Sequence, residues 1–489
     1  RIACWAMLSK FFPIITTPTF TVAEALPNQP PVLSFPTAAP YAGDGIDPNK
    51  GTIETEFTFK TIYTDADNDS PQNISLIVGD GIATTRALAL DASAPVELRD
   101  GNYVNGEQFT ATSTFPKKAN HQYHFEVSDG KGGVARSPET GELNFSVINV
   151  PVIIVPGGMG SELFWQNFEG THTKVWIPDS YSSIDNLLRL NYLAMKVSGQ
   201  ESEQPLTVGD VIRKDDAVGD VLDSLISTLT TRLPENNYEE EKDLFVFPYD
   251  WRFDIIRSAV IGESSLKTKI ENIKNQTGSQ KVDIIAHSQG GLVAKFYIAG
   301  HGRGNVRKFI DIATPHLGAP KAFKTLMWGD DLGQTDLWSI PHSRLENKIK
   351  DVSQNMPSVY QLLTSKTYID KIGMYYFEPE HSWFDSWGGN WLNYNQTMEF
   401  LSKYNTNAFS WNDNLHNSID DWKNYGVEET INIVGCGLST IGKIKTLNTV
   451  EAVAHNYKTY SLEYISGDET VPYVSGEQLL KTDHTFFIK

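Results

Sequence analysis

The chain has 489 residues, which is too long for one ordinary domain and predicts two or three. Its formal net charge of −19 argues against binding a nucleic acid or an anionic membrane surface, because like charges repel, although a neutral lipid is not excluded. Two cysteines, Cys4 and Cys436, exclude a disulfide framework and a zinc cluster, and no stretch is apolar over the roughly 18 residues of a membrane-spanning helix.

Residues 1–30 read as a leader followed by a linker. Basic residues flank a moderately apolar stretch, and Ala23-Glu24-Ala25 resembles a signal-peptidase site. Pro13 and Pro18 interrupt the apolar run, so a disordered leader is the alternative to the remnant of an export signal.

Residues 31–149 alternate apolar and polar side chains, most clearly over 53–61, 123–127 and 143–147. Period-two alternation with turn residues between the runs predicts a small antiparallel β-sandwich. The block resembles the immunoglobulin-like or cadherin-like modules of many exported bacterial proteins. We therefore expect a bacterial protein that is secreted, periplasmic or on the cell surface.

Asp65, Asp67 and Asp69 lie in one acidic turn of this predicted sandwich. Clustered carboxylate oxygens suit a hard cation, which makes these residues candidate calcium ligands. Aspartate is also a good turn former without any metal, and the sequence leaves both interpretations open. No other cofactor is predicted.

From residue 150 to residue 489, short apolar runs alternate with helical spacing, which predicts βαβ units and a parallel sheet. The predicted strands are 152–155, 244–247, 282–285, 309–312 and 431–434, and the predicted helices are 218–229 and 266–273, the second ending at Gly278.

Two stretches, about 164–211 and 323–425, break the alternation and are predicted to be cap insertions. The aromatic residues of the second are Trp338, Trp383, Phe384, Trp387, Trp391 and Trp411. Exposed aromatics there would suit an apolar substrate, and the alternative is that they fill the core of the cap itself.

The hexapeptide Ala286-His287-Ser288-Gln289-Gly290-Gly291 follows a predicted strand and precedes a helix. A serine on such a sharp turn is the nucleophile elbow of α/β-hydrolases. Strand and helix crowd each other there, so only small residues fit two positions either side of the serine. Ala286 and Gly290 meet this demand, although Ala286 replaces the usual glycine, and an ordinary turn containing serine is the alternative.

A serine nucleophile needs a base and an acid that orients the base, and in this fold the chain order is serine, acid, histidine. Asp468 is the preferred acid, in a loop after the predicted strand near Leu462. The competing acids are Glu469, Asp483 and Asp311. His484 is the only histidine after Asp468, so chain order assigns it as the base.

The tetrahedral intermediate needs N–H donors aimed at its oxyanion. The backbone N–H groups of Gln289 and Gly158 are the candidates, with Met159 as the alternative to Gly158. A phosphate cradle would also use a glycine-rich loop, but it would require a Lys-Ser/Thr ending that is absent here. His287 is expected to point away from Ser288 and either to pack or to line the rim of the site.

Seven motifs in order make the chain from about residue 150 resemble the lecithin:cholesterol acyltransferase-like family, with its lysosomal phospholipases and phospholipid:diacylglycerol acyltransferases. They lie at 155–157, 247–252, 287–291, 314–320, 355–358, 435–438 and 467–472. The Pro-Tyr-Asp-Trp-Arg sequence at 248–252 is the most discriminating, because generic α/β-hydrolases lack it.

The resemblance implies an α/β-hydrolase fold and an acyl-enzyme formed from a lipid ester by Ser288, Asp468 and His484, with Gly158 at the oxyanion position. Water or an alcohol would accept the acyl group, and contact with a lipid surface would be transient. A peptidase or amidase on the same fold, or an inactive surface-adhesion protein, are the other hypotheses.

The disulfide-closed lid of mammalian members is missing. The chain ends at Lys489, where the family fold normally continues into a helix, which suggests a fragment.

Overall fold

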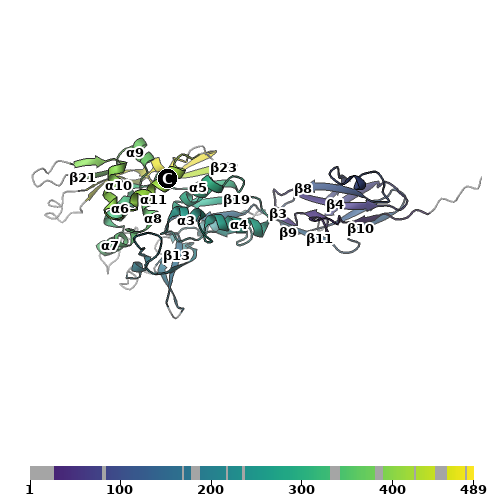
Figure 1. Cartoon of the computed structure of the whole chain (residues 1–489), viewed down its shortest axis with the longest axis horizontal. Helices are drawn as coiled ribbons and strands as arrows, with labels where there is room; N and C mark the ends of the chain where they lie inside the picture. The colour runs from purple at the N-terminus through teal and green to yellow at the C-terminus, as the bar shows by residue number, and fades with distance from the viewer. Residues whose placement is uncertain are drawn as a thin grey trace, which may run out of the picture. The chain divides into compact units, whose positions relative to one another are not determined.

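The computed structural model describes residues 27–79, 84–167, 170–177, 188–215, 219–233, 237–330, 342–379, 389–422, 426–446, 460–479 and 482–489. The predicted export signal lies outside these residues. The chain splits into two compact units (Figure 1). The first comprises Arg1–Asp47, Phe57–Ser113 and His121–Asn144, and the second comprises Pro48–Glu56, Thr114–Asn120 and Phe145–Lys489.

Two sheets carry the strands before residue 149. One runs in the order β1-β4-β8-β7 with β2 on β4, and the other runs β3-β11-β9-β5-β6 with β10 on β9. The strands of the first sheet are β1 Val32–Ser34, β2 Ile46–Asp47, β4 Phe57–Thr64, β7 Ala89–Leu90 and β8 Glu107–Ser113. Those of the second are β3 Lys50–Thr52, β5 Asn73–Val78, β6 Thr84–Ala87, β9 Lys118–Ser128, β10 Val134–Ser137 and β11 Leu143–Ile148.

The apolar faces of these two sheets meet. Phe57, Phe59 and Tyr63 of β4 are buried at every second position, and so are Tyr123 and Phe125 of β9. The rings of Phe59 and Tyr123 come from different sheets, and their centroids lie 5.2 Å apart in an edge-to-face arrangement. The region therefore has the architecture of the predicted sandwich, while its kinship to immunoglobulin-like or cadherin-like modules stays a prediction.

A parallel sheet forms the centre of the second unit, in the order β18-β12-β19-β20-β23-β26. Its strands are β12 Val152–Val155, β18 Leu244–Val246, β19 Val282–His287, β20 Val306–Ile312, β23 Glu429–Gly435 and β26 His484–Ile488. The first five coincide with predicted strands, because each contains a short apolar run; β12, β18 and β19 are buried on both faces, whereas β20 and β23 alternate between buried and half-buried positions. This sheet and its helices confirm the predicted α/β-hydrolase fold.

The helices that accompany this sheet are α2 Asp223–Thr231, α3 Ile255–Val260, α4 Leu266–Thr277 and α5 Gln289–His301. Helix α4 ends at Gly278, whose φ of +76° closes it in the left-handed conformation, as predicted. The helix predicted over 218–229 begins only at Asp223, because Gly219–Asp220 (β17) pairs with Lys214–Asp215 (β16). Helix α5 is apolar on all sides because it is buried behind the sheet.

The two predicted insertions form elements outside the central sheet. The first holds a small sheet in the order β14-β13-β15, made of His172–Trp176, Ser161–Gln166 and Leu206–Val211, and the 3-10 helix Leu190–Leu193 (η2). The elements of the second are α6 Pro320–Trp328, α7 His342–Ser353, α8 Pro357–Gln361, α9 Lys366–Ile372, β21 Tyr376–Pro379, β22 Gly389–Leu392, α10 Tyr394–Ser402 and α11 Ala408–Ile419.

A four-stranded sheet, β22-β21-β24-β25, joins the second insertion to a hairpin, of which the sequence predicted the second strand, near Leu462, but not the first. The hairpin strands are Leu438–Thr446 (β24) and Tyr460–Gly467 (β25), and the helix Tyr473–Gly476 (α13) follows them. Trp411 is buried against Tyr360, and Trp391 contacts Phe377. These two aromatics pack within the insertion, whereas Trp338, Trp383, Phe384 and Trp387 lie outside the described residues.

Candidate active site

Ser288 lies at the sharp turn between strand β19 and helix α5. Its φ of +52° and ψ of −125° are rare for a residue with a side chain and mark a strained backbone of the kind found at functional sites. The Ser288 N–H donates to the carbonyl of Ile312 on β20, at 2.9 Å. The turn therefore lies at the carboxyl end of the parallel sheet.

Steric crowding explains why the residues around Ser288 are small. A methyl group on Gly290 would lie 2.3 Å from the carbonyl oxygen of Pro156, and one on Gly291 would lie 1.8 Å from Thr314 Oγ1. Ala286 is fully buried where β19 pairs with both of its neighbours. The expected crowding is therefore confirmed, and a single methyl at position 286 is accommodated.

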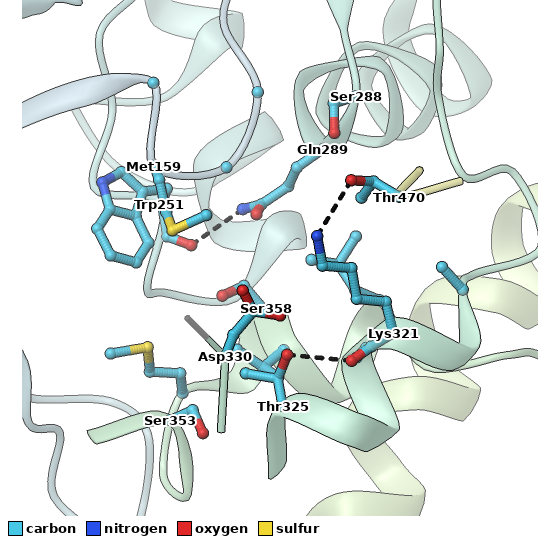
Figure 2. Close-up of a pocket in the computed structure, with 18 of the residues that line it drawn as sticks. Met159, Trp251, Ser288, Gln289, Lys321, Thr325, Asp330, Ser353, Ser358 and Thr470 are labelled. Atoms are coloured by element: carbon cyan, nitrogen blue, oxygen red, sulfur yellow. Dashed lines mark hydrogen bonds between the residues drawn. The ribbon is translucent and has the colours of Figure 1, made fainter. Parts of the chain in front are cut away.

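Ser288 borders a cavity of about 410 Å³ whose walls come from both insertions (Figure 2). The apolar side chains of its walls are Met159, Trp176, Ile177, Leu193, Ile212, Val221, Trp251, Pro315, Ala319, Ala322, Ile349, Val352, Met356, Val359, Leu362 and Val471. Polar side chains are fewer, and they are Lys321, Thr325, Asp330, Ser353, Ser358 and Thr470 together with His287, Ser288 and Gln289. A mostly apolar cavity with a few convergent polar groups is typical of a small-molecule site.

The loop after β12 forms a tight turn beside Ser288. The Gly160 N–H donates to the Gly157 carbonyl at 3.0 Å, and Met159 takes a φ of +64°, so this is a type II turn with methionine where glycine is usual. Gly158 borders the cavity, and a methyl there would lie 2.4 Å from Gln289 Oε1. Gln289 begins α5, so its N–H has no partner within the helix.

Two side chains donate hydrogen bonds to this loop, which we call the oxyanion loop (residues 156–160), and a third binds the nearby backbone of Trp251. Tyr249 Oη donates to the Pro156 carbonyl at 3.1 Å, and Trp176 Nε1 donates to the Met159 carbonyl at 2.7 Å. Gln289 Nε2 donates to the Trp251 carbonyl at 3.0 Å, as Figure 2 shows. Burial raises the pKa of Tyr249, so its hydroxyl stays a donor.

Arg252, the last residue of the Pro-Tyr-Asp-Trp-Arg sequence, is completely buried. Its Nε and Nη2 atoms contact the Asp250 carboxylate at 2.9 and 2.7 Å. Its Nη1 donates to the Leu193 carbonyl at 3.1 Å and to Ser202 Oγ at 2.9 Å. The charge is thus paired, and the arginine ties the first insertion to the loop that supports Ser288, a role that sequence reasoning did not assign.

Asp468 directly follows strand β25 and lies at the carboxyl end of the central parallel sheet, as Ser288 does. Its Oδ1 accepts the N–H groups of Thr470 at 2.9 Å and Val471 at 2.7 Å. Thr470 and Val471 themselves line the Ser288 cavity. The structure therefore brings the predicted acid and the predicted nucleophile to one end of the sheet.

The competing acids have other partners. Asp311 and His316 Nε2 form a completely buried pair at 2.9 Å. Asp483 Oδ2 accepts the Thr430 N–H at 2.7 Å, and the side chain of Glu469 is exposed. None of the three acids lines the Ser288 cavity or the hollow beside it, whereas Asp468 lines that second hollow and is followed by two residues that line the first, which favours Asp468.

His484 does not meet Ser288, so the base assignment from chain order needs correction. His484 is the first residue of strand β26 and lies opposite Ile431 on β23. The Ser288 N–H is hydrogen-bonded to Ile312, which lies opposite Ile433, two residues further along β23. Strand β26 is three strands from β19, which puts His484 about 14 Å across the sheet and about 7 Å back along it. Its side chain is exposed, at the wrong end of the strand for a base.

A second hollow, of about 240 Å³, lies beside Asp468. It is lined by Ile312, Ala313, Ile433, Gly435, Cys436, Leu438, Asp468, Ile488 and Lys489. No histidine of the described residues is among them. The one described histidine that lines the Ser288 cavity is His287, whose ring lies against Gly157 as expected for the rim, and burial lowers its pKa.

The acidic turn in the first unit does bring its three carboxylates together, with ligand oxygens of Asp65, Asp67 and Asp69 within 4.8 Å of one another. Asp65 Oδ1 accepts the N–H groups of Asp67 at 2.9 Å and Asp69 at 3.1 Å, and Asp69 pairs with Lys131. These bonds are those of an aspartate turn, so calcium binding stays a prediction.

The chain matches one protein family. The family model of lecithin:cholesterol acyltransferase covers residues 219–472, just over half of the chain, with both Ser288 and Asp468 inside the match. Over 187 residues the chain is 27% identical to Lecithin-cholesterol acyltransferase-like 4 of Arabidopsis thaliana, which is 35% of each protein. Over 87 residues it is 38% identical to Phospholipase A(1) LCAT3 of the same plant, 17% of this chain and 19% of that protein.

The chain thus spans about a third of the first of these relatives and about a fifth of the second. Two solved structures are also similar, each at 14% identity over 69% of this chain. They are the Tle4-Tli4 complex (TM-score 0.43, 91% of that chain) and the lin2722 gene product of Listeria innocua (TM-score 0.23, 83% of that chain).

Proposed function

The chain belongs to the lecithin:cholesterol acyltransferase family, and from this we propose that it is a serine-dependent enzyme that takes an acyl group from a lipid ester. The observation that carries the proposal is the strained Ser288 turn at the edge of a mostly apolar cavity of about 410 Å³. An apolar cavity beside a nucleophile suits a fatty acyl chain better than a peptide, which would need polar partners for its amides.

In the proposed reaction, Ser288 Oγ attacks the ester carbonyl carbon while a base takes its proton. The oxyanion that forms accepts hydrogen bonds from the backbone N–H groups of Gly158 and Gln289. The ester C–O bond then breaks, the departing alkoxide takes the proton, and the acyl group stays on Ser288. Attack by water or by an alcohol on this acyl-enzyme releases the acid or a new ester.

Asp468 is the proposed acid, since the carboxylate is held by Thr470 and Val471 at the end of the sheet where Ser288 lies. An imidazole that bridges Asp468 and Ser288 would occupy the hollow next to Asp468, which is bounded by Ala313 and Gly435. His484 is not proposed for this role, because it lies at the opposite end of β26.

Fluorophosphonate labelling followed by mass spectrometry tests the nucleophile, with the modified peptide expected to contain Ser288. Phospholipid turnover with and without an added alcohol then separates hydrolysis from acyl transfer, and an amide of the same acyl group tests peptidase-like activity. Ser288→Ala should lose at least about a thousandfold in kcat/KM. Unchanged ester turnover in a folded Ser288→Ala variant would refute the proposal.

The cellular location stays a prediction. Export was inferred from residues 1–30 and from the resemblance of residues 31–149 to modules of exported proteins, and the residues before 27 lie outside the described part of the chain. Among the described residues, no helix combines the length and the apolar character that crossing a membrane requires.

A further inference from the structure

We propose that Thr314 and Asp311 position an oxyanion donor of the active site, because they hold the peptide unit that carries the Gln289 N–H. The inference rests on the proposed function, since it concerns how the same site meets the charge that develops on the ester. Neither residue lines the Ser288 cavity, and both side chains are completely buried. Both therefore act through the backbone of Ser288 and do not touch the substrate.

The Ser288 carbonyl is the point at which this contact is made. Thr314 Oγ1 donates to that oxygen at 3.0 Å, and the Gly291 N–H donates to the same oxygen at 2.9 Å. Because a peptide unit is planar and trans, its C=O and N–H groups point in opposite directions. Donors that hold the Ser288 carbonyl therefore also set the direction of the N–H group of the next residue, Gln289, and they polarise it toward stronger donation.

Asp311 fixes the direction of the Thr314 hydroxyl. Thr314 Oγ1 donates to Asp311 Oδ1 at 2.8 Å, and the other carboxyl oxygen, Oδ2, lies 2.9 Å from His316 Nε2. The hydroxyl has one proton for two acceptor oxygens, the Ser288 carbonyl and the Asp311 carboxyl, which share it in a three-centre bond. All three side chains are completely buried, so bulk water does not compete for these contacts.

Helix α5 is packed directly against this pair of oxygens. A methyl group on Gly291 would lie 1.8 Å from Thr314 Oγ1 and 2.4 Å from Asp311 Oδ1. The Ser288 N–H donates to the carbonyl of Ile312, which follows Asp311 in strand β20. Strand β20 and the residues after it therefore hold the Ser288 backbone at both its N–H and its C=O.

The backbone of Ser288 needs such support, because its φ of +52° and ψ of −125° are rare for a residue with a side chain. A conformation of this kind persists only where the surrounding contacts determine it. The angle ψ of Ser288 sets the orientation of the peptide unit that it shares with Gln289. Relaxation of ψ would therefore turn the Gln289 N–H away from the oxyanion and weaken its stabilisation of the transition state.

A structural role is the competing explanation. Lys295 of α5 is completely buried, and its Nζ has no hydrogen-bond partner in the described part of the chain. It interacts electrostatically with Asp311 and Asp420, so Asp311 could serve only to compensate this cation. That role predicts a loss of stability when Asp311 is changed, and no effect of the Thr314 hydroxyl on catalysis.

The test compares Thr314→Ala with Thr314→Ser, two variants that both lack the methyl group and differ only in the hydroxyl. For p-nitrophenyl hexanoate, kcat of Thr314→Ala should be about tenfold below that of Thr314→Ser, with KM within about twofold, because the hydroxyl acts on the transition state and not on substrate binding. Deleting an oxyanion donor costs about a hundredfold or more. The loss here is smaller because the Gly291 N–H still holds the carbonyl.

A transition-state analogue measures the oxyanion contact directly. Ser288 Oγ adds to the carbonyl carbon of a dodecyl trifluoromethyl ketone, its proton passes to the base, and the ketone oxygen takes the electron pair as an oxyanion. The inhibition constant of this ketone should therefore be about tenfold higher for Thr314→Ala than for Thr314→Ser.

Thr277 provides the matched control. Its buried hydroxyl donates to the Ile273 carbonyl of α4 at 2.7 Å, and Thr277 does not line the cavity. Thr277→Ala should lower the melting temperature by a few degrees and leave both kcat and the inhibition constant at their wild-type values. The same fall in kcat in Thr277→Ala would show that lost stability alone explains the effect at Thr314.

Equal kcat in Thr314→Ala and Thr314→Ser, or a difference that lies in KM alone, would overturn the inference. If Thr314→Ala does not fold, Thr314→Cys decides, because a thiol is a weaker donor at the same place. Its kcat should fall several-fold at unchanged KM, and a wild-type kcat refutes the role of the hydroxyl.

Asp311→Asn separates positioning from acid catalysis. The amide still offers Thr314 a hydrogen-bonding group of the same shape, so kcat should fall only a few-fold. A loss of a hundredfold or more would make Asp311 the catalytic acid and would overturn its positioning role. Failure of the proposed function is a different result, in which the wild-type chain turns over no ester and Ser288 is not labelled by the fluorophosphonate.

Discussion

The nucleophile side and the acid side of the site are built in different ways. Around Ser288, a strained turn, the oxyanion loop and the Pro-Tyr-Asp-Trp-Arg sequence are joined by hydrogen bonds of Tyr249, Trp176 and Gln289. On the other side, Asp468 follows a hairpin that leaves the central sheet, and β26 is an edge strand. Phe486, at 53% exposure, and its two successors leave about half their surface open to solvent.

This difference shows that the nucleophile elbow can be inferred from the sequence more securely than the base can be inferred from chain order. The elbow can be recognised locally, because its small residues are sequence neighbours of Ser288, although the atoms that crowd them belong to Pro156 and Thr314. The position of His484 depends on the register and direction of a strand that contacts the sheet on one side only. A rule about the order of catalytic residues says nothing about that register, and here it selected a residue at the wrong end of the strand.

Asp468→Asn should give the largest effect on the acid side, a fall in kcat of about a hundredfold to ten-thousandfold, because an amide neither fixes the tautomer of a base nor stabilises its cation. Ester turnover over a range of pH measures it. Glu469→Gln is the matched control, since that neighbouring side chain is exposed and should leave kcat within about twofold. Equal effects of the two changes would remove Asp468 from the proposed site.

Tyr249→Phe tests the nucleophile side with a smaller effect. It deletes the hydroxyl that holds the Pro156 carbonyl and leaves that buried oxygen without its donor, which costs about 1–2 kcal/mol of stability. If the oxyanion loop depends on this bond, kcat should fall about tenfold with little change in KM.

Tyr394→Phe provides the control for this loss of stability. Its buried hydroxyl donates to Asn412 Oδ1 at 2.8 Å, and Tyr394 does not line the cavity. Both variants should therefore lower the melting temperature by a few degrees, and only Tyr249→Phe should lower kcat. A similar kcat in the two variants would show that the oxyanion loop does not need the Tyr249 hydroxyl.

The sequence was most informative where one physical cause dominates. Short apolar runs predicted β12 and β19 because a parallel strand is buried on both faces, and Gly278 predicted a helix end through its left-handed conformation. Trp176 and Lys321 were not predicted as cavity residues. They come from regions without regular periodicity, where tertiary packing decides which side chains face Ser288.

Some of the missed features had a signal in retrospect. Lys321 directly follows the motif at 314–320, and a lysine in the first turn of a helix runs against the helix dipole. Arg252 and Asp250, in an otherwise apolar and aromatic sequence, indicated a buried, paired charge. Strand β24 had no such signal, because it has polar residues on both faces.

His484→Ala should have the smallest effect and decides whether the two sides differ as described. The exposed ring lies at the far end of β26, so its removal should change kcat/KM by less than about twofold and leave the melting temperature unchanged. Turnover of a p-nitrophenyl ester by the two proteins measures this directly. A loss as large as that of Asp468→Asn would mean that β26 adopts another register in the active enzyme. In that case the order of residues along the chain would have identified the base better than the strand pairing does.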